Sequence, residues 1–344
     1  PLRSQARQHP HPLVIAGGVA CCLNPEPLAP FIDCFLIGEA EALLKQFTEC
    51  ILENGLTDQR SPEDRSAVLA RCARRVTGTY VPSLYQPEYQ PNGILSGFSP
   101  LADVPARIRR AYPEDLADTA TCSVIVTPDT TFDQSFLVEV GRGCPHGCRF
   151  CSAGFVYRPP RFRPPQLLHQ CVREGSRKAE SVGLVGAAVS DLPGIREVCR
   201  HALAENVRVS FSSLRADALD DDLLAALRHS KVKTATLAPD AGSERMRRVI
   251  NKGITEEIFL QAAERLVTSG IANLKLYFMV GLPGETLDDV DAVIRLVKRI
   301  KHVFLKASRP RKRIGEITVS LNSFVPKPVT PFQWVAMDDT ATLK

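Results

Sequence analysis

The chain has 344 residues, of which 44% are hydrophobic and 24% are charged, and its formal net charge is +5 at pH 7. This size and balance indicate an ordinary globular chain with one large core, or a core plus a smaller companion domain. The charge excess is too small to indicate a nucleic-acid-binding protein. Eleven cysteines in so long a chain favour metal or redox chemistry over a disulfide scaffold.

The start of the chain bears on its location and on its completeness. The weakly polar stretch 13–23 is too short and too rich in glycine to span a bilayer, and no charged-then-apolar leader precedes it. We therefore predict a cytoplasmic protein with no membrane partner. The chain opens at Pro1, and its first twelve residues are polar and rich in proline, so we expect a fragment that lacks an upstream part.

Residues 1–60 have the pattern of the end of an α/β, Rossmann-like domain. A short apolar strand at 13–15, a turn at Gly17 and Gly18, a second strand at 34–37 and a helix at 39–54 alternate along this stretch. Two strands and a helix bury too little apolar surface to be stable alone. We expect an incomplete α/β layer rather than a self-standing domain.

Residues 61–133 are predicted to form a helical and irregular connector. Ser61 is a candidate N-cap, followed by Pro62 at the first helical position, and the helix should run to about Val76. From 77 to 131, proline, tyrosine and glycine recur every few residues, so regular elements there should be short.

Residues 134–334 alternate between strands and helices in six units. Strands are expected at 136–140, 183–189, 207–211, 234–237, 274–280 and 317–324, with helices beginning near Pro165, Pro193, Asp220, Ser243, Thr255 and Thr286. This order predicts a parallel sheet, and six units are too few for a closed eight-stranded barrel, so we predict a partial (β/α)6 barrel. Ligands should gather at the carboxyl ends of its strands. Residues 335–344 would form a tail.

A cysteine cluster begins four residues after the first of these strands. Cys144, Cys148 and Cys151 form a Cys-x3-Cys-x2-Cys pattern in a loop where several glycines allow tight bending. Thiolates are the usual ligands of iron-sulfur clusters, and a cubane has four irons, so three local ligands leave one iron free. The pattern therefore favours a cluster with one open coordination position.

A zinc-stabilised binding module is the alternative from another class. Cys122, Cys171 or His169 would complete a four-ligand zinc site with the same loop. Zinc ribbons usually show a second Cys-x2-Cys pair, which the sequence lacks.

The cysteine loop resembles the signature of the radical S-adenosylmethionine (SAM) superfamily, including the aromatic Phe150 before the third cysteine. The resemblance implies that Cys144, Cys148 and Cys151 bind a 4Fe-4S cluster whose fourth iron is chelated by SAM. It implies reductive cleavage of SAM to a 5′-deoxyadenosyl radical that acts on an unidentified substrate. An electron donor such as flavodoxin or ferredoxin is the implied partner.

Further positions for SAM follow from the same resemblance. Arg215 lies in a Ser-Leu-Arg segment and is the candidate partner of the SAM carboxylate, unless it forms a surface ion pair. Asp240 stands where related proteins have Glu, and Ser190 is a guess because the expected Gly-Gly-Glu is absent. The implied cofactor-binding residues are Phe150, Ser190, Ser213, Arg215, Asp240, Gly281 and Pro283.

Segments near both ends of the chain resemble a subgroup of radical SAM proteins with an N-terminal cobalamin-binding-like domain. Residues 13–44 are similar to the last third of that domain, so residues 1–60 would be its C-terminal remnant. The sequence contains no Asp-x-His-x-x-Gly motif for a lower cobalt ligand. Cobalamin is therefore expected only if upstream residues are missing.

Two alternatives within the superfamily stay open, a methylthiotransferase acting on RNA or a ribosomal protein and a cobalamin-dependent radical methyltransferase. The basic run 309–313 is a candidate for RNA contact. A solvated helix end and loop explains it better, because no aromatic residues for base stacking are interleaved.

Overall fold

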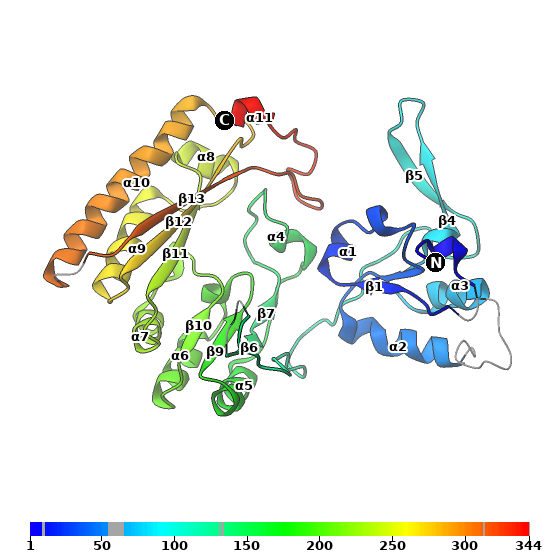
Figure 1. Ribbon diagram of the computed structural model, residues 1–344, viewed down its shortest axis with the longest axis horizontal. Helices are drawn as coiled ribbons and strands as arrows, with labels where there is room; N and C mark the ends of the chain where they lie inside the picture. Colours follow the sequence, from blue (N-terminus) through cyan, green and yellow to red (C-terminus); the bar gives the residue numbers. More distant parts are fainter. Residues whose placement is uncertain (9–10, 54–64, 131, 133, 312–313, 344) are drawn as a thin grey trace. The chain divides into compact units, whose positions relative to one another are not determined.

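A computed structural model describes residues 1–8, 11–53, 65–130, 132, 134–311 and 314–343 (Figure 1). The chain divides into two compact units, Pro1–Glu114 and Asp115–Lys344, which we describe separately. Among the described helices, none is both long enough and apolar enough to cross a membrane.

The first unit contains a three-stranded sheet in the order β1-β2-β3. Strand β1 (Ile15–Gly17) pairs parallel with β2 (Cys34–Leu36), and β3 (Thr79–Tyr80) pairs antiparallel with β2. The same unit contains three helices, α1 (Val19–Leu23), α2 (Ala40–Glu53) and α3 (Arg65–Arg75). Phe35, Phe47 and Val68 are buried in one core, because α2 and α3 turn their apolar stripes toward the strands.

The remaining residues of this unit form short elements, as the density of proline and glycine predicts. Strands β4 (Tyr85–Tyr89) and β5 (Leu95–Pro100) make an antiparallel hairpin. The predicted helix start at Ser61 lies outside the described residues, and the described helix ends at Arg75, one residue before the predicted end. The unit extends to Glu114, whereas the sequence places a border at residue 60. The predicted borders at 60, 133 and 334 remain predictions.

The second unit contains six parallel strands in two sheets of three. Strands β6 (Ser135–Glu139), β9 (Ser181–Val185) and β10 (Val209–Phe211) form one sheet in the order β10-β9-β6. Strands β11 (Thr234–Asp240), β12 (Asn273–Val280) and β13 (Ile317–Ser323) form the other in chain order. All six overlap the predicted strands, and the predicted partial barrel is confirmed. The largest difference in bounds is at the second strand, predicted at 183–189, because the chain leaves the sheet at Val185 and forms a short 3-10 turn at Val189–Asp191.

Helices cover one side of these sheets (Figure 1). They are α5 (Pro165–Lys178), α6 (Ile195–Ala204), α7 (Asp221–His229), α8 (Glu244–Val249), α9 (Glu256–Thr268) and α10 (Leu287–Ser308). The side chains of Asp220, Ser243 and Thr255 accept backbone hydrogen bonds as N-caps, and Thr286 forms a capping box with Asp289. Each return helix thus begins where the sequence predicts, which brings the carboxyl ends of the strands to one edge.

Candidate active site

The cysteine loop lies between β7 (Gly141–Arg142) and the short helix α4 (Ala153–Val156), directly after β6. Gly143 has φ +84°, and a Cβ there would lie 2.5 Å from the carbonyl oxygen of Tyr157. Only glycine fits this position, because both the backbone angle and the space exclude a side chain. The loop therefore turns tightly directly before Cys144.

The three thiols differ in exposure. Cys148 is buried, whereas Cys144 and Cys151 are half-buried, and Cys151 interacts electrostatically with both of the others. Burial raises the pKa of Cys144 and of Cys148. The backbone N–H of His146 acts in the opposite direction on the pKa of Cys144, and Lys252 does so on the pKa of Cys148. Within the described ranges, no group of three or more His, Cys, Asp or Glu residues is arranged to hold a metal ion. Convergence of the three thiols on a cluster stays a prediction.

A charged network occupies the ends of β9 and β10. Asp191, in the turn after β9, lies 2.8 Å from His146 through Oδ1 and Nε2. Arg215, after β10, donates two hydrogen bonds to Asp217 at 3.0 and 2.8 Å, and its Nε lies 3.9 Å from Asp191 Oδ1. Asp217 therefore fixes Arg215 near the cysteine loop. No described residue accepts a hydrogen bond from Nη1 of the guanidinium, so this group can bind another acceptor.

Ser190 and Ser213 connect the two segments that carry this network. The Ser190 hydroxyl accepts a hydrogen bond from the backbone N–H of Arg215 at 3.0 Å. The Ser213 hydroxyl donates to the Gly186 carbonyl and accepts from the Val189 N–H, at 3.1 and 3.0 Å. Both serines thus order the backbone at the ends of β9 and β10.

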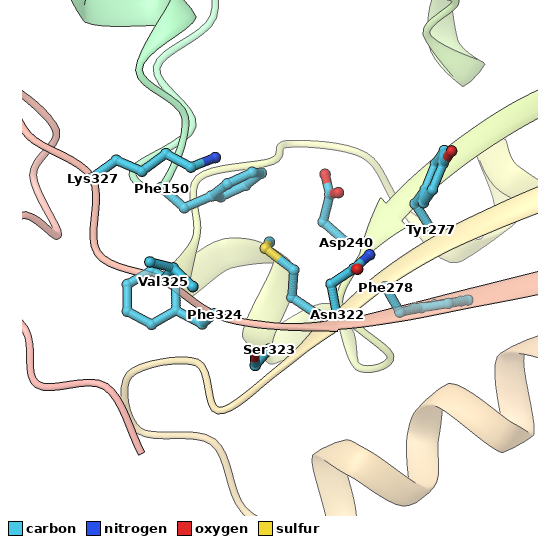
Figure 2. A pocket seen from close by; sticks show the side chains of 10 residues that line it. Phe150, Asp240, Tyr277, Phe278, Asn322, Ser323, Phe324, Val325 and Lys327 are labelled. Carbon is cyan, nitrogen blue, oxygen red and sulfur yellow. The ribbon is translucent and has the colours of Figure 1, made fainter. Parts of the chain in front are cut away.

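A cavity of about 310 Å³ lies at the ends of β11, β12 and β13 (Figure 2). Four of its ten lining residues are aromatic, and the others include an amide, a serine hydroxyl and two charged groups. It is lined by Phe150, Asp240, Tyr277, Phe278, Met279, Asn322, Ser323, Phe324, Val325 and Lys327. The aromatic residue of the cysteine loop thus lies in the same cavity as the last residue of β11.

Asp240 is held by an ion pair at this cavity. Its Oδ2 lies 2.6 Å from Nζ of Lys252, and both side chains are largely buried. Burial raises the pKa of Asp240, and Lys252 acts in the opposite direction. Asp240 also has φ +63°, an uncommon conformation for a residue other than glycine. Such strain is typical of functional sites.

Gly281 and Pro283 follow β12. Gly281 has φ +77°, and its N–H donates to Glu285 Oε2 at 2.7 Å. A Cβ at Gly281 would lie 2.9 Å from Leu343 and 3.2 Å from Asp338, so the tail packs against this turn. Neither Gly281 nor Pro283 is among the described residues that line the cavity of Figure 2.

The structure adds residues that the sequence did not single out: His146, Asp191, Lys252, Asn322 and Lys327. His146 and Asp191 stand inside segments already identified, but pairing across 45 positions leaves no sequence signal. Asn322 follows the alternation of β13, which could have identified it as a residue near the carboxyl end of that strand.

Comparisons with known proteins bear on the family. The profile "Radical SAM superfamily" matches residues 138–297, and the profile "Radical SAM proteins, N-terminal" matches residues 1–82. An uncharacterised protein of Methanocaldococcus jannaschii is 33% identical over 335 residues, covering 96% of this chain and 64% of the relative. A tRNA-2-methylthio-N(6)-dimethylallyladenosine synthase of Carboxydothermus hydrogenoformans is 26% identical, covering 56% of this chain and 47% of the relative. The chain thus spans less than two thirds of these relatives.

Two further similarities also extend over most of the chain. The threonylcarbamoyladenosine tRNA methylthiotransferase MtaB of Treponema pallidum is 23% identical over 99% of this chain and 74% of the relative. The cobalamin-dependent SAM radical enzyme OxsB, solved with aqua-cobalamin and SAM, has a TM-score of 0.53 at 14% identity, over 87% of this chain and 43% of that one. The second similarity supports the fold. With both profiles, the relatives and the partial barrel in agreement, this chain belongs to the radical SAM superfamily.

Proposed function

We propose that this chain is the SAM-cleaving part of a radical enzyme, in which Cys144, Cys148 and Cys151 hold a 4Fe-4S cluster. The observation that carries the proposal is the position of the cysteine loop at the carboxyl ends of a parallel partial barrel, beside a charged network and an aromatic cavity. The three cysteine side chains fit a 4Fe-4S cluster chemically, because soft thiolates are the usual ligands of iron in such clusters.

When bound, the reduced cluster supplies the electron that cleaves SAM into methionine and a 5′-deoxyadenosyl radical. The residues of this chain bind and orient the sulfonium compound. Arg215 offers its free Nη1 to the carboxylate, while Phe150 and Asp240 lie where the adenosine would be received. Gly281 and Pro283 shape the neighbouring turn. Ser190 and Ser213 fix the strand ends, and their direct contact with SAM stays a prediction.

The test is anaerobic reconstitution with iron and sulfide, followed by metal analysis, electron paramagnetic resonance (EPR) and chromatography of 5′-deoxyadenosine. We expect about four irons and four sulfides per chain. Cys148→Ala should lose the cluster and all SAM cleavage. Cys199→Ala, which removes a buried cysteine from α6, is the matched control and should keep both. One zinc per chain without iron would contradict the proposal and support the zinc-stabilised binding module.

A methylthiotransferase is the second candidate, because two of the relatives named above carry that activity in their names. RNA would then be the partner, and the exposed basic residues at the end of α10, such as Arg309 and Arg311, are candidates for phosphate contact. Incubation of the reconstituted protein with SAM, sulfide, tRNA and reduced flavodoxin or ferredoxin should then add a methylthio group, detected by mass spectrometry of the nucleosides.

A cobalamin-dependent radical methyltransferase is the third candidate, favoured by the fold similarity to OxsB. Residues 1–60 would be the remnant of the cobalamin-binding-like domain. We also propose that the protein is located in the cytoplasm. We expect this chain alone not to bind cobalamin tightly, because the lower-ligand motif is absent from its sequence. A stoichiometric cobalamin spectrum after gel filtration would contradict that expectation and favour radical methyl transfer.

A further inference from the structure

His146 stands between Cys144 and Cys148, two of the proposed cluster ligands, and its side chain contacts Asp191 in the turn after β9. Its Nε2 donates to Asp191 Oδ1 at 2.8 Å, and the two side chains are 30% and 18% exposed. Of the described residues, His146 alone donates a hydrogen bond to this carboxylate, and Asp191 Oδ2 is buried without a partner. Each residue of the pair therefore depends on the other, and the hydrogen bond to a charged acceptor is of the stronger kind.

The main chain of His146 is fixed as well. Its backbone N–H faces the sulfur of Cys144, and a Cβ on Gly154 would lie 2.5 Å from its carbonyl oxygen. The side chain of His146 thus connects the end of β9 to a peptide group that faces a proposed cluster ligand. Hydrogen bonds from backbone N–H groups to cluster sulfurs are one of the factors that set the reduction potential.

The other side of the loop is attached to the turn after α8, which follows β11 of the second sheet. The side chain of Asn251 donates to the Gly147 carbonyl at 2.9 Å, and the N–H of Arg149 donates to the Ile250 carbonyl at 2.9 Å. The loop is therefore held from both halves of the barrel. The His146–Asp191 bond is the attachment on the side of β9, next to Arg215.

We propose that His146 and Asp191 form a positioning pair that sets the orientation of Cys144 and its cluster edge toward Arg215, and so toward SAM. This inference rests on the proposed function and goes beyond it, because neither residue is a ligand. Outer partners that orient metal ligands typically change affinity or activity by about 10- to 100-fold when they are removed.

The experiment compares His146→Ala, Asp191→Ala, the double variant and Asp191→Asn, each reconstituted and matched for iron content. SAM affinity is measured by equilibrium dialysis, and the midpoint potential by an EPR-monitored redox titration. We expect each alanine variant to bind SAM about tenfold more weakly, with the double variant no weaker than either, because the two residues act as one unit. Asp191→Asn keeps an acceptor for His146 and should restore most of the affinity.

The midpoint potential of the cluster distinguishes the positioning role of His146 from a general loss of protein stability. His146→Ala should shift it to more negative values, since the N–H toward Cys144 is no longer held in place. Asp191→Asn should not shift it in that direction, because it removes a negative charge. His201→Ala, a histidine on α6 away from the loop, is the matched control and should leave affinity and potential unchanged.

Unchanged SAM affinity and potential in His146→Ala at full iron content would overturn the inference. If that variant does not fold, equal affinities of Asp191→Ala and Asp191→Asn would overturn it instead. A wild-type protein that takes up no iron would refute the proposed function itself, which is a distinguishable result.

Discussion

The two halves of the barrel present different chemistry at their strand ends. The ends of β9 and β10 carry charged, hydrogen-bonded groups around Asp191 and Arg215, whereas the ends of β11 to β13 enclose an aromatic cavity with Phe150 and Tyr277. One half is suited to the charged amino-acid end of a ligand and the other to a flat, less polar end. SAM combines both parts in one molecule, so the division of the barrel matches the division of the proposed ligand.

The largest effect is expected in the second half, where Asp240 in the cavity wall forms an ion pair with Lys252. Lys252→Met would leave Asp240 buried without its counter-ion, and removing one partner of a buried pair costs about 3–5 kcal/mol of unfolding free energy. Chemical denaturation measures the loss. The double variant Lys252→Met with Asp240→Asn should recover much of it, and a double variant as unstable as the single one would show that packing, not charge, dominates here.

The next effect tests the charged half. Arg215→Ala should weaken SAM binding by about 1.5–3 kcal/mol, the range for hydrogen bonds to charged groups. Binding of methylthioadenosine, which has the adenosine part but no amino acid, should not change. Isothermal titration with both ligands checks the difference, and equal losses for both would contradict the division of the barrel. Asp217→Asn weakens only the ion pair that holds Arg215, so its SAM affinity should lie between those of the wild type and Arg215→Ala.

A smaller effect is expected from the aromatic half. Asn322→Ala removes one neutral amide from the cavity wall and should lower the binding free energy of SAM by about 1 kcal/mol. The binding free energy of methylthioadenosine should fall by the same amount, whereas Arg215→Ala should affect SAM alone. A loss confined to SAM would place the amino-acid end in this cavity and reverse the comparison.

The smallest effect concerns the helices behind the first half. Burial, aided by the stacked ring of His201, lowers the pKa of His169 below its usual 6.5. The folded state therefore binds fewer protons than the unfolded one, and stability should fall as the pH falls through about 6.5. We expect urea unfolding to show a small loss of stability between pH 7.5 and 5.5, measured as a lower midpoint concentration. His169→Gln should reduce this pH dependence, and an unchanged slope would assign it to other groups.

The sequence predicts the barrel well because each element carries a local signal. Asp220 and Thr255 are recognisable as caps before amphipathic runs, and their side chains accept the backbone hydrogen bonds that this pattern predicts. The first unit is predicted less well. Strand β3 at Thr79–Tyr80 is only two residues long, and its pairing with β2 depends on contacts that no local pattern contains.

The candidate site divides in the same way. The cysteine loop is evident from its spacing, but the hydroxyl of Ser190 is engaged by a backbone N–H, and its neighbour Asp191 bonds to His146 instead. Lys252 could not be paired with Asp240 from the sequence, because the turn after α8 brings them together. Which of two adjacent polar residues forms a given hydrogen bond depends on the direction of its side chain. The hydrophobic periodicity of the sequence does not determine that direction.

The attachment of the cysteine loop has a consequence for the order of folding. Arg149 donates through its N–H to Ile250 and accepts through its carbonyl from the N–H of Phe332, and Gly147 is bonded by a side chain 104 residues away. Contacts over such separations close late, because their loop-closure entropy must first be offset by other structure. During synthesis, the loop can reach its final shape only after β13 and the segment following it have emerged. Iron delivered earlier would meet a cysteine loop that has not yet reached its final shape.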